Sequence, residues 1–134
     1  MDGVELTTLN RIKHPKGDVY HALRANEASF FGFGEAYFTT ILCGETKGWK
    51  KHLRMTMNLV VPVGNVCFYM HNEDTQETVM FELGERNYRR LTVGPGIWVA
   101  FKGCGNDINL VLNIASIPHD PSESINVILE TFSL

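Results

Sequence analysis

The 134-residue sequence lacks an excess of positive charge and any long apolar run. Its net charge of −3 at pH 7 provides no basic surface, so we do not expect nucleic acid as a partner. No apolar run approaches the roughly 18 residues that a membrane span requires, so no membrane segment is expected. The N-terminal residues include early acids and no apolar stretch, which indicates that they are not a signal peptide.

Cysteine is also scarce. The three residues, Cys43, Cys67 and Cys104, are an odd number and include no CxxC pair. Each lies in or beside an apolar, strand-like stretch, so we predict reduced thiols that act as small buried hydrophobic groups. Reduced thiols fit a cytoplasmic protein.

A long helical period is missing as well, and short strand-like segments take its place. They are rich in β-branched and aromatic residues and end at Gly, Pro, Asn or Asp. About nine strands are predicted, including residues 19–23, 35–42, 55–63, 66–70, 77–83, 88–93, 97–101 and 108–115. Residues 125–134 are predicted as a short helix or a last strand. This pattern predicts one all-β domain over residues 1–134, a barrel or jelly roll.

The segment 47–64 has the most unusual composition. Four cations and one histidine lie within residues 47–54, in a basic and turn-like start to the apolar run 55–63. Pro62, Val63 and Gly64 end that run. Lys50 and His52 alternate, so an extended backbone would direct both side chains to one face.

This spacing resembles that of the cupin family. Its first motif is G-x5-H-x-H-x(3,4)-E-x6-G, and with the closing glycine at Gly64, Lys50 and His52 take the H-x-H places and Met57 the acid place. The second motif, anchored on Gly96, puts Val99 in its histidine place. The resemblance implies a cupin double-stranded β-helix, a jelly-roll barrel. Three of the four ligand places carry no suitable donor, so we expect no metal and no other cofactor. A lone-histidine metal cupin is the remaining alternative, and it predicts stoichiometric metal in the purified protein.

Within the cupins, the sequence is similar to the dTDP-4-dehydrorhamnose 3,5-epimerase-like family of sugar-nucleotide epimerases and ketoisomerases. The similarity covers about residues 17–125. It rests on six short matches that occur in the same order and with the same spacing as in the family, at 17–24, 33–38, 47–52, 58–60, 64–66 and 94–101. The sequence departs from the family at its usual catalytic positions. Lys50 stands in the place of the catalytic histidine, Asn58 replaces a lysine, and the family's acidic tyrosine falls near Asn113.

The resemblance implies a cytoplasmic homodimer that binds a nucleotide-linked sugar in bacterial surface polysaccharide (O-antigen or capsule) synthesis. A metal-independent isomerase or epimerase would take a proton from the carbon next to a ketone. A non-catalytic sugar or sugar-nucleotide binding cupin, or a partner subunit, is the alternative. The orientation of the polar side chains distinguishes the enzyme from the non-catalytic cupin: side chains that converge and face inward favour a functional site.

Candidate catalytic residues are His52 and Lys50, either of which would be the base. His52 is alternatively a hydrogen-bonded structural histidine. Lys50 is alternatively a phosphate contact or a solvated lysine. Tyr37 and Tyr69 are candidates for the second proton-transfer group, and alternation alone does not place them inside.

Candidate substrate-binding residues extend over several strands. Arg24 and Lys47 are expected to hold a diphosphate, and Glu35 occupies another nucleotide-contact place of the family; Arg24 and Glu35 are alternatively an ion pair. Three further candidates are Asn58, Asn113 and Trp98. The asparagines would form a polar floor or make structural hydrogen bonds, and Trp98 would contact ligand or belong to the core. Residues 118–123 are expected to be a solvated loop.

Overall fold

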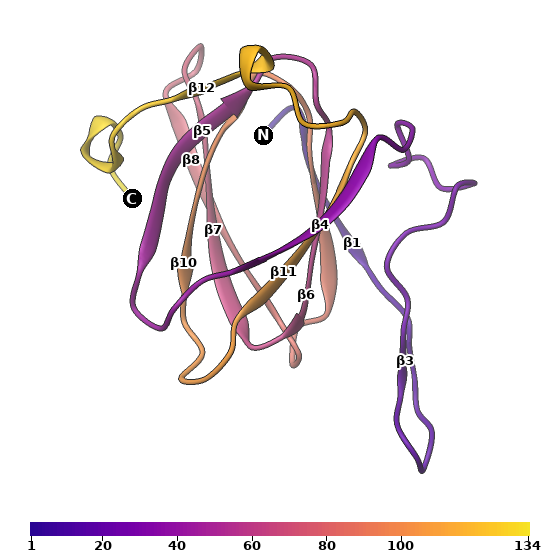
Figure 1. The fold of residues 1–134 in the computed structure, drawn as a ribbon. Coiled ribbons are helices and arrows are strands. Elements are labelled where there is room, and N and C mark those ends of the chain that lie inside the picture. The colour runs from indigo at the N-terminus through magenta and orange to yellow at the C-terminus, as the bar shows by residue number, and fades with distance from the viewer.

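The computed structural model describes all 134 residues and is built almost entirely of antiparallel strands (Figure 1). Two five-stranded sheets face each other and enclose the core, and a small two-stranded hairpin projects from them. The predicted all-β jelly-roll barrel is therefore confirmed. No helix in the structure is long and apolar enough to cross a membrane.

The first sheet has the strand order β1-β9-β6-β11-β4. Its strands are β1 (Val4–Thr8), β9 (Arg89–Val93), β6 (Met57–Val63), β11 (Leu110–Ala115) and β4 (Glu35–Thr40). The central strand β6 has buried residues on both faces, because the core covers one face and the N-terminal segment covers the other.

The second sheet has the strand order β12-β5-β10-β7-β8. Its strands are β12 (Ser124–Asn126), β5 (Thr46–His52), β10 (Trp98–Gly103), β7 (Asn65–Asn72) and β8 (Glu77–Gly84). The remaining elements are the hairpin β2 (Arg11–Ile12) and β3 (Val19–Tyr20), and two short 3₁₀ helices, η1 (Pro121–Glu123) and η2 (Leu129–Thr131).

The apolar core fills the space between the sheets most completely near β7, β8 and β9. Period-2 alternation directs Val66 and Met70 of β7 and Leu91 and Val93 of β9 inward, where all four are fully buried. Burying one such side chain contributes about 1.5–3 kcal/mol. The opposite side of the sandwich, between β4 and β5, is less filled and contains the cavity described below.

The tight turn between β6 and β7 depends on Gly64. Its φ of +84° is in the left-handed region, and a Cβ there would lie 2.3 Å from the carbonyl oxygen of Ile108. Glycine is therefore required both by the backbone conformation and by the close approach of the chain before β11.

Some predicted segments differ from the structure. Residues 47–52 are not turn-like but form most of strand β5, because pairing with β10 and β12 extends this polar stretch. Residues 125–134, predicted as a short helix or a last strand, contain both the end of the last strand β12 and the short 3₁₀ helix η2.

Candidate functional site

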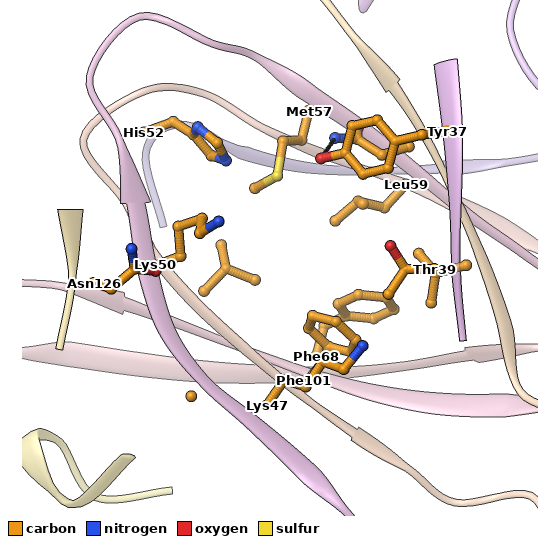
Figure 2. A pocket seen from close by; sticks show the side chains of 14 residues that line it. Tyr37, Thr39, Lys47, Lys50, His52, Met57, Leu59, Phe68, Phe101 and Asn126 are labelled. Atoms are coloured by element: carbon orange, nitrogen blue, oxygen red, sulfur yellow. Dashed lines mark hydrogen bonds between the residues drawn. The ribbon is translucent and has the colours of Figure 1, made fainter. Parts of the chain in front are cut away.

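A cavity of about 370 Å³ lies between the two sheets, on the side where β4 and β5 face each other (Figure 2). Its volume is within the range of small-molecule sites, roughly 300–1,000 Å³. Its floor is apolar, formed by Met57, Leu59, Phe68, Val99, Phe101 and Val111. Polar side chains stand on its two walls: Tyr37, Thr39 and Asn113 from the first sheet, and Lys47, Lys50, His52 and Asn126 from the second.

Strand β5 brings Lys50 and His52 to the same wall. Alternation along this strand directs both toward the cavity, while Trp49 and Lys51 face the outer side of the sheet. Lys51 pairs there with Glu73 at 3.0 Å. Strand β5 therefore divides its cations between solvent and cavity.

His52 forms a buried pair with Glu123. The side-chain oxygen Oε1 of Glu123 accepts a hydrogen bond from Nδ1 of His52, and the two residues are only 7% and 3% exposed. An ionised carboxylate can only accept, so it fixes the proton of a neutral ring on Nδ1. Nε2 is then unprotonated, and it has no hydrogen-bond partner within the chain.

Backbone groups hold the other oxygen of Glu123. The N–H groups of Arg54 and Met55 both donate to Oε2 at 3.2 Å. Burial raises the pKa of Glu123, but the hydrogen bonds from His52 and from these two N–H groups outweigh burial and hold its pKa below the ordinary value. Glu123 is therefore a carboxylate at neutral pH and is ready to stabilise a protonated His52.

Glu123 is not among the predicted site residues, because the sequence of residues 118–123 predicts a solvated loop. The local interpretation is sound: Asp120 caps η1 and Pro121 begins it, so this is a tight turn. The burial of Glu123 arises because β12 follows directly and pairs with β5, Ser124 lying opposite His52. Nothing in the local sequence predicts the pairing of β12 with β5.

Tyr37 stands on the opposite wall of the cavity, paired with Asn113 of the adjacent strand (Figure 2). Nδ2 of Asn113 donates to the Tyr37 hydroxyl oxygen at 2.9 Å. The phenol therefore receives one hydrogen bond and keeps its own proton for another acceptor. Oδ1 of Asn113 is buried and has no hydrogen-bond partner within the chain. Tyr69, the other tyrosine considered, packs on the outer face of the second sheet.

The two lysines of the cavity differ in their contacts. Nζ of Lys47 donates to the Thr40 carbonyl oxygen at 2.8 Å and lies 5.7 Å from the ring centre of Phe101. Lys47 therefore links β5 to β4 across the edge of the sandwich. The exposed Lys50 has no ion pair and no hydrogen bond within the chain, so its ammonium group is available to a ligand.

Four predicted site residues do not line this cavity. Arg24 is largely exposed, and its guanidinium lies 3.8 Å from Glu27 rather than near Glu35. Glu35 instead accepts a hydrogen bond from the backbone N–H of His119 at 3.0 Å. Trp98 is buried on the outer side of the second sheet, against Trp49.

Asn58 lies on the outer face of the first sheet. Its Nδ2 donates to the Ser29 carbonyl oxygen at 2.9 Å, and its Oδ1 accepts from Thr92 at 2.6 Å. The first contact holds the N-terminal segment against β6, and the second links β6 to β9. Of the predicted residues, the structure thus brings together Lys47, Lys50, His52 and Asn113, and with them Tyr37, one of the two tyrosines considered for proton transfer. No group of three or more His, Cys, Asp or Glu side chains is placed to hold a metal ion.

Comparison with known proteins identifies relatives among solved structures, whereas no family model and no curated protein matches the sequence. The dTDP sugar isomerase from Desulfovibrio desulfuricans G20 is 32% identical, with a TM-score of 0.92 over 97% of this chain and 87% of that chain.

Two further structures are similar in fold at lower identity. The 3,4-ketoisomerase QdtA from Thermoanaerobacterium thermosaccharolyticum, solved in complex with TDP, is 21% identical, with a TM-score of 0.80 over 93% of this chain and 88% of that chain. The dTDP-4-dehydrorhamnose 3,5-epimerase from Sulfolobus tokodaii is 13% identical, with a TM-score of 0.88 over 100% and 82% of the two chains.

Proposed function

Because the chain belongs to the dTDP-sugar isomerase and epimerase family of cupins, we propose that it is a metal-independent enzyme acting on a nucleotide-linked keto sugar. The reaction is proton transfer at a carbon next to the ketone. The observation that carries this proposal is the buried His52–Glu123 pair, whose unprotonated Nε2 faces a sugar-sized cavity.

His52 acts as the base. Its Nε2 takes the proton from the carbon beside the carbonyl, and the ring becomes a cation next to Glu123. The lowered pKa of Glu123 keeps it charged, so that it stabilises this cation without taking up a proton. Removing the carbon-bound proton leaves an enolate, whose negative oxygen requires a positive or hydrogen-bonding group nearby.

Lys50 is the group that stabilises the enolate oxygen. It stands two residues before His52 on the same face of β5, and nothing in the chain neutralises its charge. Lys47 lies at the start of β5, at the other end of the strand from His52, and there it contacts the diphosphate. Arg24 remains a proposed diphosphate contact and Glu35 a proposed nucleotide contact, although neither lines the cavity of its own chain.

Tyr37 returns a proton. Its hydroxyl is on the β4 wall, across the cavity from the His52 wall, and its proton is not used by Asn113 (Figure 2). A base and an acid on opposite walls suit removal of a proton from one face of the sugar and its delivery to the other. Delivery to the neighbouring carbon of the enediol would instead move the ketone.

The setting of this activity is bacterial surface polysaccharide synthesis, O-antigen or capsule, in the cytoplasm. This setting is what the sequence resemblance implies, and the relative described as a dTDP sugar isomerase supports only the class of substrate. We also expect a homodimer. β4 is an unpaired sheet edge, and Phe38, Phe33 and Phe31 are 60–65% exposed on or beside it. Light scattering should give twice the chain mass of 15.1 kDa.

Proton NMR in deuterated water tests the function. The protein is incubated with dTDP-, UDP- and GDP-linked 4-keto sugars, and deuterium is followed at C3 and C5 while product signals identify an epimer or a moved ketone. His52→Asn should slow exchange by at least about 100-fold. His119→Asn is the matched control, because this histidine is exposed and does not line the cavity.

The outcomes separate the two hypotheses. Exchange that is lost in His52→Asn and kept in the control supports the enzyme. Saturable binding of one sugar nucleotide without exchange would reject it in favour of a non-catalytic binding module, and exchange unaffected by His52→Asn would reject the assigned base.

A further inference from the structure

The C-terminal residues 123–132 wrap around the edge of the second sheet. Figure 1 shows this segment in yellow, crossing the end of β5 and finishing on the side of that strand away from β4. It begins at Glu123, passes Asn126 at the cavity, and ends at Phe132 on the outer face of the sheet. One short segment therefore joins the site to the opposite side of β5.

The segment has few attachments between these two ends. β12 contributes three residue pairs with β5, and the N–H of Val127 donates to the Trp49 carbonyl oxygen at 3.1 Å. The Trp49 ring N–H donates to the Leu129 carbonyl oxygen at 2.9 Å. No side chain after Glu123 makes a hydrogen bond or ion pair, and Ile125, Asn126 and Ile128 are exposed.

Phe132 is the aromatic anchor of the segment, beside Val127 and Leu129, which pack on the same Trp49–Trp98 cluster. Its ring stacks on His71 with ring centres 4.0 Å apart and lies 5.4 Å from Trp49 in an edge-to-face arrangement. It also lies 5.6 Å from Trp98. Aromatic pairs of this kind contribute about 0.5–1.5 kcal/mol each beyond the area they bury.

We propose that Phe132, seated on Trp49, His71 and Trp98, is a positioning residue that keeps Glu123 against His52. The inference rests on the proposed function only for its effect on turnover. Phe132 does not reach the cavity, so it acts through the segment: when the anchor is lost, β12 frays from β5 and the carboxylate leaves Nδ1 of His52. His52 then loses the partner that fixes its tautomer.

Three variants test the anchor. Phe132→Ala removes the ring, Phe132→Leu keeps an apolar group, and Ile128→Ala is the matched control on the same segment, because Ile128 is 72% exposed. We expect Phe132→Ala to lower kcat about tenfold, by analogy with the roughly 10- to 100-fold losses when a partner that orients a metal-binding histidine is removed. Phe132→Leu should recover part of this loss, and the control should resemble the unchanged protein.

Two measurements do not need activity. The ¹⁵N signals of the His52 ring report its tautomer and should shift in Phe132→Ala, toward a mixture of tautomers. A Glu-specific protease should cut after Glu130 faster in that variant. Thermal unfolding confirms that each variant is folded before comparison.

The proposal is overturned if His52 ring signals and cleavage rate are the same in Phe132→Ala and Ile128→Ala. If the unchanged protein exchanges no proton on any sugar, the proposed function fails, and the ring signals still decide whether Phe132 positions Glu123.

Discussion

Two buried pairs of a basic side chain with a carboxylate attach irregular segments to the barrel, one on each sheet. Arg90 of β9 is fully buried, and its Nη2 lies 2.8 Å from Glu27 of the N-terminal segment. His52 of β5 is paired with Glu123 at the start of the C-terminal segment. In both cases a carboxylate from a non-strand segment docks on a basic side chain of a strand.

The difference lies in where the unpaired nitrogen of each basic group is placed, because Arg90 also has an unpaired Nε, which is buried away from the cavity. Arg90 uses Nη1 on the Ala22 carbonyl oxygen and Nη2 on Glu27, and it touches no part of the cavity. His52 bonds Glu123 through Nδ1, and its Nε2 faces the cavity. A buried pair of the first kind stabilises the fold, whereas a pair with a free nitrogen at a cavity can also transfer a proton.

Glu123→Gln tests this distinction with the largest expected effect. The amide can still accept from the Arg54 and Met55 N–H groups, but toward His52 it would donate, which moves the ring proton to Nε2. Proton exchange should fall about 10³- to 10⁴-fold, as when a catalytic histidine is held in the wrong tautomer. The hydrogen bonds are conserved, so the free energy of unfolding should change by less than about 2 kcal/mol.

Exchange kinetics and urea unfolding of the same preparation give the exchange rate and the free energy of unfolding of Glu123→Gln. Glu73→Gln is the control, because Glu73 pairs with Lys51 on the outer face of the same strand. Equal exchange rates in the two variants would show that Glu123 is only structural.

Arg90→Met should give the opposite result. Removing one partner of a buried pair typically costs about 3–5 kcal/mol, which urea unfolding would measure. Exchange per folded molecule should stay the same, because Arg90 is on the outer face of the other sheet. Arg86→Met, at an exposed arginine, is the control. A loss of exchange in folded Arg90→Met would mean that the N-terminal segment shapes the site.

The sequence predicts the barrel well because strand alternation and glycine turns are local properties. It also places Lys50 and His52 on one face, because the alternation of two residues within one strand can be predicted without knowing the rest of the fold. Strand β5 itself is less obvious: its cations face solvent or an open cavity, and Trp49 is its one fully buried residue. A strand with so few buried residues has little hydrophobic pattern.

Glu123 and Asn58 show why the rest of the site could not be predicted. Glu123 is in a true turn sequence and becomes buried only through the pairing of β12 with β5, which is distant in sequence. Asn58 is in an apolar strand that is buried on both faces, so alternation cannot say which face is the cavity. The family resemblance predicts neither the burial of Glu123 nor the face on which Asn58 lies, because its motif positions are also counted along one strand.

Acid stability gives the smallest expected effect and compares the two carboxylates directly. Burial raises the pKa of Glu27, but hydrogen bonds from Arg90 and the Arg24 N–H outweigh it, and the pKa lies below its ordinary value of 4.5, as does that of Glu123. A carboxylate whose folded pKa is lowered stabilises the protein above its unfolded pKa. That stabilisation is lost as the pH falls through the folded value.

The contribution of these two groups to the free energy of unfolding, measured with urea on the unchanged protein, should therefore vary little between about pH 7 and pH 5. The lower limit is about half a unit above their ordinary pKa of 4.5, and the contribution should weaken progressively below pH 5. Each carboxylate contributes at most about 1.4 kcal/mol per pH unit in that range. Glu123→Gln and Glu27→Gln should each flatten the acid limb, because the variant has one fewer carboxylate to protonate. If only Glu27→Gln flattens it, Glu123 is not held as a carboxylate in the fold, and the base at His52 lacks the partner that sets its tautomer.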